Sequence, residues 1–107
     1  MRDLASLGLP IHVSELDISL NRGRGLLSSE AQLQARQAHL ATEIAEAVMA
    51  LKPAQRFAFT TWGLRDKDSW LRGPKENPDP PWDAPLLFDN DGRPKRMLVA
   101  LEKGFAV

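Results

Sequence analysis

The sequence predicts an α/β protein in which strands alternate with helices and pair in parallel. Two segments with strand character, residues 11–18 and 56–62, are separated by a long segment with helical periodicity, residues 30–51. This order is typical of βαβ units and a parallel sheet. The first strand is also apolar on both faces, which favours a parallel sheet that is covered on both sides. A length of 107 residues corresponds to a single domain, 1–107.

Composition excludes several classes of partner and site. The 14 basic residues balance 14 acidic ones and form no basic run, so we expect no nucleic-acid partner and no anionic-membrane partner. The absence of cysteine excludes disulfides and thiolate metal sites. No apolar run reaches the roughly 18 residues of a membrane span. The first ten residues lack a signal-like apolar core, so the residues alone do not indicate a compartment.

The first elements lead to a strand with an unusual pattern. Residues 3–7 are predicted to end a helix, with Gly8 as its stop and Pro10 after it. In the strand 11–18, alternation predicts two faces: Ile11, Val13, Glu15 and Asp17 on one, and His12, Ser14, Leu16 and Ile18 on the other. Two carboxylates therefore share a face with apolar residues, which is costly inside a core unless they have partners.

The middle of the chain predicts one long helix. Ser29 and Gln32 form a capping-box pattern before residues 30–51, and Pro53 ends the helix. The predicted inward stripe is Leu33, Gln37, Leu40, Ile44, Ala47, Val48 and Leu51.

Regular structure ends after the second strand and returns only near the C-terminus. Residues 73–85 contain five of the eight prolines and are predicted to be irregular. The last helix is predicted over 94–103, with Pro94 at its first position. Its predicted inward side chains are Met97, Leu98 and Leu101.

Side chains suited to a binding site follow both strands. Functional sites of parallel sheets form at the carboxyl ends of the strands. Glu15 and Asp17 lie near the end of the first strand, and Trp62 and Trp70 lie at and beyond the end of the second. Flat aromatic faces beside carboxylates suit a sugar ring. The alternatives are that the tryptophans, Trp82 included, are core side chains and that the carboxylates are helix caps or solvated charges.

The two histidines are predicted to be structural or solvated. His12 lies on the face opposite Glu15, and His39 lies within the long helix. No His, Asp or Glu spacing matches a metal site, and no glycine-rich phosphate loop is present. We therefore expect neither a metal nor another cofactor.

Three segments carry a family resemblance: GLPIHVSELDIS (8–19), FTTWGLRDKDSWL (59–71) and APLLFDNDGRPK (84–95). On these segments the chain resembles the C-terminal portion of the endo-β-1,4-xylanases of glycoside hydrolase family 10. The resemblance implies the last two βα units, strands 7 and 8 with their helices, of a TIM (β/α)8 barrel that is incomplete as a single chain. It also implies hydrolysis of xylan and a secreted or periplasmic location. One departure is Leu98, where the family has an aromatic residue.

The resemblance also implies roles for individual residues. Glu15 matches the catalytic nucleophile, and Asp17 matches a supporting acid that is linked to the nucleophile through a histidine. Trp62 and Trp70 match tryptophans that bind the sugar beside the bond to be cut, and Asp66 matches a structural position. The binding partner would be xylan or a xylo-oligosaccharide.

The second carboxyl group of the family's catalytic pair is missing from the chain. In the family this acid/base glutamate follows an asparagine at the end of the fourth strand, and no Asn-Glu pair occurs here. We therefore expect the chain alone to be inactive. Because its strands would have unpaired edges, we also expect it to self-associate. The alternative function is a non-catalytic piece that self-assembles or binds carbohydrate.

Overall fold

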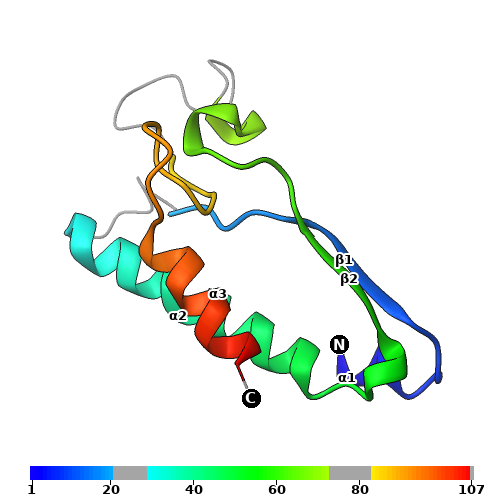
Figure 1. The fold of residues 1–107 in the computed structure, drawn as a ribbon. Helices are drawn as coiled ribbons and strands as arrows, with labels where there is room; N and C mark the ends of the chain where they lie inside the picture. Colours follow the sequence, from blue (N-terminus) through cyan, green and yellow to red (C-terminus); the bar gives the residue numbers. More distant parts are fainter. Residues whose placement is uncertain (21–28, 73–82, 107) are drawn as a thin grey trace.

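The computed structural model describes residues 1–20, 29–72 and 83–106, and it has the predicted α/β order (Figure 1). Strands β1 (Ile11–Leu16) and β2 (Arg56–Thr61) pair in parallel, and helix α2 (Glu30–Met49) connects them. The other elements are α1 (Arg2–Ala5), α3 (Arg96–Phe105) and the short 3-10 turns η1 (Pro53–Gln55), η2 (Asp66–Asp68) and η3 (Trp70–Arg72). In the described residues, no helix is long and apolar enough to cross a membrane.

Strand β1 differs from the prediction in its end and in one of its faces. It ends at Leu16 rather than Ile18, because the N–H of Ile18 donates to the carbonyl of Pro85 (3.0 Å) instead of to β2. An extra residue lies in β1 where Val13 to Leu16 opposes only Phe59 to Thr61. This bulge breaks the alternation. Val13 consequently packs against the cluster that contains Leu16, and its predicted place on the face of Glu15 is wrong.

Helix α2 begins as predicted and buries Gln37 and Val48 of the predicted stripe, but Ala41 and Ala45 are buried in place of Leu40. The capping box is confirmed: the Ser29 hydroxyl accepts from the Gln32 N–H (3.1 Å), and the Gln32 side chain accepts from the Ser29 N–H (2.9 Å). The helix ends at Met49, two residues early. Leu40 was predicted to be inward but is 39% exposed, whereas Ala41 is fully buried. Small side chains are buried here because α3 packs closely against α2.

Helix α3 supplies the other half of this contact. It begins at Arg96 with Lys95 as its N-cap, so the predicted start at Pro94 is two residues early. The backbone of Lys95 is extended (φ −102°, ψ 169°), so Lys95 is outside the helix, and its N–H donates to the carbonyl of Leu87 (2.9 Å). Met97 and Leu101 are buried as predicted, and Leu98 is half-buried.

Gly104 sets the distance between α3 and α2. A Cβ added at Gly104 would lie 2.5 Å from the Cβ of Ala45 and 3.1 Å from the carbonyl oxygen of Thr42. Alanine favours helix over glycine by about 1 kcal/mol, but neither of these neighbours is flexible. We expect Gly104→Ala to destabilise the chain by about 1–3 kcal/mol through overpacking. Urea unfolding measures this, with Glu102→Ala on the exposed side of α3 as control; an equal or higher midpoint would contradict the packing.

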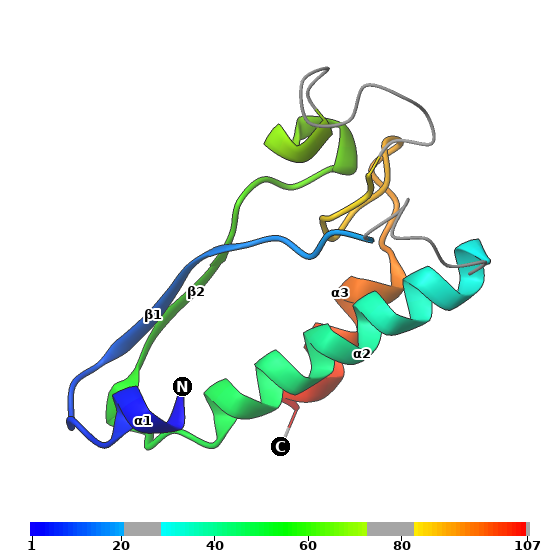
Figure 2. The same cartoon turned by 180° about the vertical axis from the view of Figure 1, so that it is seen from behind.

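The core lies between the strands and the helices. Figures 1 and 2 show α2 and α3 side by side along one side of the strands. The buried cluster consists of Leu16, Ile18, Ala41, Ala45, Met97, Ala100 and Leu101. Phe57 in β2 is 70% exposed, so one face of the sheet is open in the described residues. The prediction of a sheet covered on both sides is therefore wrong for this part of the chain. Two strands with two helices supply cover for one face only.

Candidate active site

The carboxyl ends of the two strands bring the predicted site residues to one edge. The N–H of Trp62 donates to the carbonyl of Leu16 (2.9 Å), so parallel pairing continues one residue beyond β2. Trp62 therefore lies level with the stretch that contains Glu15 and Asp17. Glu15 is exposed in this structure, which corrects the expectation that its face is buried. Asp17 is half-buried.

Trp70 is held against Asp17. Its indole N–H donates to Oδ2 of Asp17 at 2.9 Å, across 53 residues of sequence. The contact orients the ring relative to the strand end, and the side chain of Trp70 remains 56% exposed. Trp62 is 50% exposed. Neither tryptophan is a core residue here, so both rings offer surface on which a planar or sugar-like ligand can pack.

A bridging segment, residues 83–88, fixes the end of β1. The N–H of Ile18 donates to the carbonyl of Pro85 (3.0 Å). The N–H of Leu20 donates to Oδ1 of Asp83 (2.9 Å). These bonds replace the pairing that β1 loses after Leu16, and they set the direction in which the chain leaves the strand.

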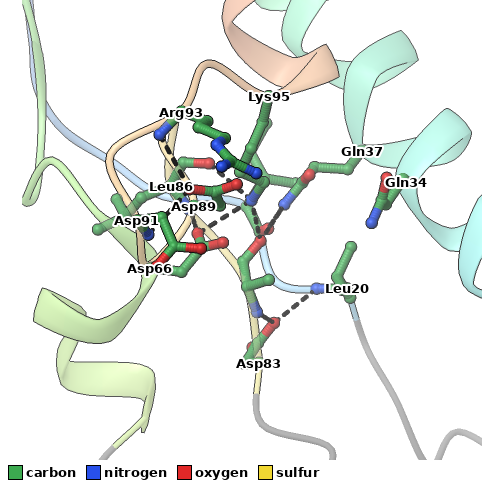
Figure 3. Close-up of polar contacts among 12 residues, drawn as sticks. Leu20, Gln34, Gln37, Asp66, Asp83, Leu86, Asp89, Asp91, Arg93 and Lys95 are labelled. Carbon is green, nitrogen blue, oxygen red and sulfur yellow. Dashed lines mark hydrogen bonds and ion pairs between the residues drawn. The ribbon is translucent and has the colours of Figure 1, made fainter.

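The same segment fixes the chain after β2. The N–H of Asp66 donates to the carbonyl of Phe88 (2.9 Å), and the N–H of Leu86 donates to Oδ1 of Asp66 (2.9 Å). The ammonium group of Lys95 binds that carboxylate oxygen (2.9 Å) and the carbonyls of Ala84 and Leu86 (2.8 Å each). Figure 3 shows these groups converging on the segment. The structural role predicted for Asp66 is confirmed.

Gln37 connects helix α2 to the chain after β1 and to the bridging segment. Its side chain is 2% exposed, and its amide nitrogen donates to the carbonyls of Ile18 (2.8 Å) and Ala84 (2.6 Å). The sequence analysis placed Gln37 in the inward stripe without giving it a partner. A polar residue in an apolar stripe signals such a bond, because a buried amide needs partners. Asp83 and Lys95 do not lie in an apolar stripe, so no such signal marks their bonds in the sequence.

An exposed ion pair stabilises the turn η2. The Nε of Arg65 lies 3.0 Å from Oδ2 of Asp68. The hydrogen bond from Arg65 lowers the pKa of Asp68 below its ordinary value of 3.8. The stabilisation is therefore present above that ordinary pKa and is lost as the pH falls through the lowered one.

The remaining predicted residues lie outside the site. The ring of His12 contacts the hydroxyl of Thr60 (3.2 Å), and His39 pairs with Glu43 (3.2 Å) on the exposed side of α2. Both fit the predicted structural or solvated roles. Trp82 lies outside the described residues. In the part of the chain that the structure describes, no three His, Cys, Asp or Glu side chains group as a metal site.

Known proteins are similar to this chain in sequence and fold. The model of glycosyl hydrolase family 10 matches residues 1–103. Endo-1,4-beta-xylanase A of Caldicellulosiruptor saccharolyticus is 32% identical over 105 residues, 91% of this chain and 29% of that protein. Endo-1,4-beta-xylanase A of Thermoanaerobacterium saccharolyticum is 39% identical over 87 residues, 81% of this chain and 6% of that protein.

Solved structures agree with these relatives. Native xylanase 10B from Thermotoga maritima matches with a TM-score of 0.72 and 30% identity, over 97% of this chain and 30% of that one. A mutant of Xylanase10C from Cellvibrio japonicus in complex with xylopentaose matches with a TM-score of 0.83 and 25% identity, over 98% of this chain and 23% of that one. The chain thus spans less than a third of each of these proteins, and its α/β fold fits part of a TIM barrel. The chain belongs to glycosyl hydrolase family 10.

Proposed function

We propose that this chain supplies the nucleophile and part of the sugar cleft of a retaining endo-β-1,4-xylanase. The observation that carries the proposal is the joint placement of Glu15, Asp17, Trp62 and Trp70 at the carboxyl ends of two parallel strands, with Trp70 hydrogen-bonded to Asp17. The relatives described above as endo-xylanases, and the neighbour in complex with xylopentaose, support xylan or a xylo-oligosaccharide as the substrate.

In this proposal Glu15 attacks the anomeric carbon and forms a covalent glycosyl–enzyme intermediate, which water then hydrolyses. Its exposed carboxylate is accessible to a sugar. Asp17 supports Glu15 by its charge and by orienting Trp70. Trp62 and Trp70 bind the sugar beside the bond to be cut, because their exposed faces match the C–H faces of a xylose ring.

Asp17 is not the acid/base partner of Glu15. Retaining glycosidases use two carboxyl groups about 5–5.5 Å apart on either side of the bond. Asp17 lies only two residues beyond Glu15, at the same strand end, so the two carboxylates enter the site from one segment rather than from opposite sides of the bond. One oxygen of Asp17 is also bound to Trp70. The acid/base group therefore has to come from another segment, which agrees with our proposal that these are the last two βα units of the barrel. A polymeric substrate also favours a secreted or periplasmic location.

A chimera tests the proposed reaction. This chain replaces the matched segment of the Caldicellulosiruptor saccharolyticus relative, and proton NMR follows the anomeric signals during hydrolysis of xylopentaose. We expect xylanase activity and an initial product in the β configuration, which then mutarotates. An initial α product would contradict the retaining mechanism, and a folded chimera without hydrolysis of xylan would contradict the function.

A second candidate function, self-assembly, is favoured by the exposed apolar surface. Leu9 is 61% exposed and Phe57 is 70% exposed, and in the described residues the sheet consists of two strands only. Unpaired strand edges recruit other chains. We expect the 107-residue chain alone to form a dimer or a higher oligomer at micromolar concentration in sedimentation equilibrium. A monomer that unfolds cooperatively would show that the chain satisfies its own edges.

A further inference from the structure

We propose that Lys95 is a positioning residue for the candidate active site: it holds the turn that carries Trp70, and it thereby keeps the indole N–H of Trp70 bonded to Asp17. The catalytic consequence of this inference rests on the proposed function. The geometric claim does not, because it concerns only contacts within this chain.

Lys95 is placed to fix the turn rather than to contact a ligand. Its side chain is 11% exposed, and that of Asp66 is 7% exposed. The ammonium group has three acceptors within 2.9 Å: Oδ1 of Asp66 and the carbonyls of Ala84 and Leu86. An ammonium group has three N–H donors, so these contacts satisfy it completely. Lys95 thereby joins the start of α3, the bridging segment and the chain after β2 at one point.

Short contacts lead from Asp66 to Trp70. Asp66 is the first residue of η2, and its carbonyl accepts from the N–H of Ser69 (3.2 Å). Ser69 is 6% exposed, and its hydroxyl accepts from the N–H of Leu71 (3.1 Å). Trp70 thus lies between Ser69, which is bonded to Asp66, and Leu71, which is bonded to Ser69. A displacement of Asp66 moves the backbone from which the indole extends.

The exposed hydrogen bond between Trp70 and Asp17 depends on the backbone that Lys95 and Asp66 hold in place. The hydrogen bond from Trp70 to Asp17 is exposed, so water competes for both groups. The bond persists only while the backbone holds the indole N–H near the carboxylate. If Lys95 is lost, the buried carboxylate of Asp66 loses its ion pair with that ammonium group, and the carbonyls of Ala84 and Leu86 lose their shared donor. The turn then shifts and Trp70 separates from Asp17.

Indole NMR signals test this separation in the 107-residue chain, which has three tryptophans and so three indole N–H signals. Trp70→Phe assigns the Trp70 signal, and Asp17→Ala, which removes the acceptor, gives its position when the hydrogen bond is absent. We expect Lys95→Met to move the Trp70 signal toward its position in Asp17→Ala and to speed its exchange with water at least about tenfold. Lys103→Met, on the exposed side of the same helix, serves as the matched control and leaves the signal unchanged.

A double variant separates positioning from folding. Lys95→Met combined with Asp66→Asn leaves no unpaired buried charge, so it provides a folded chain if Lys95→Met alone does not. We expect the same displacement of the Trp70 signal in the double variant. An unchanged Trp70 signal in either folded variant overturns the inference. If the signal moves as expected while the chimera fails to hydrolyse xylan, the proposed function fails and Lys95 remains a positioning residue.

Discussion

Replacing Glu15 with glutamine in the chimera is expected to lower kcat/KM on xylan by at least about 10³-fold. Glutamine keeps the size of the side chain but cannot form the glycosyl ester through which a retaining reaction passes. Loss of a catalytic nucleophile costs this much or more when no other group replaces it. Initial rates on xylan, with thermal unfolding as a check on the fold, measure the effect. The side chain is exposed, so the substitution should leave stability nearly unchanged.

Glu46→Gln is the matched control for this substitution. Glu46 is an exposed residue of helix α2, outside the strand ends that carry the candidate site. We expect its activity to equal that of the unchanged chimera. Activity of Glu15→Gln within tenfold of the chimera would remove Glu15 from the nucleophile role and direct attention to another carboxylate.

The 107-residue chain alone is expected to show no appreciable xylanase activity. In our proposal it holds the nucleophile without the acid/base group, and loss of general acid–base catalysis typically costs about 10²–10⁴-fold. In the same proposal the sugar subsites are incomplete, because the chain spans 29% of the Caldicellulosiruptor saccharolyticus relative. Release of reducing ends from xylan by the purified chain, compared with the chimera at equal concentration, measures this.

The control for this prediction is Glu15→Gln in the isolated chain. Trace activity that survives the substitution indicates contaminating enzyme rather than the chain itself. Robust hydrolysis that is abolished by the substitution would instead show that the chain, alone or as an oligomer, assembles a complete catalytic pair.

Local patterns were sufficient to predict the order of elements but not the details of packing. The capping box at Ser29 depends on neighbours in sequence, and it was predicted correctly. The stripe of α2 was misplaced at Leu40 because side-chain size favoured leucine, whereas the close approach of α3 favours Ala41. The bulge after Val13 was not predicted either, since it depends on pairing with β2. Sequence periodicity describes one helix or strand at a time, whereas the buried stripe and the bulge each depend on contact between two elements.

The candidate site shows the same division. Glu15, Asp17, Trp62 and Trp70 could be grouped from the sequence, because the rule that parallel strands end on one side needs only element order. The hydrogen bond between Trp70 and Asp17 could not, since it joins residues 53 positions apart. The network around Lys95 likewise depends on where the bridging segment lies.

Trapping of the covalent intermediate tests the central proposal most directly. The chimera is incubated with a 2-fluoro-xylobioside that carries a good leaving group, which slows hydrolysis of the intermediate, and the labelled peptide is identified by mass spectrometry. We predict one fluorosugar per molecule, attached to the side chain of Glu15. A label on any other carboxylate, or stoichiometric turnover without a covalent adduct, would contradict the proposal that this chain supplies the nucleophile.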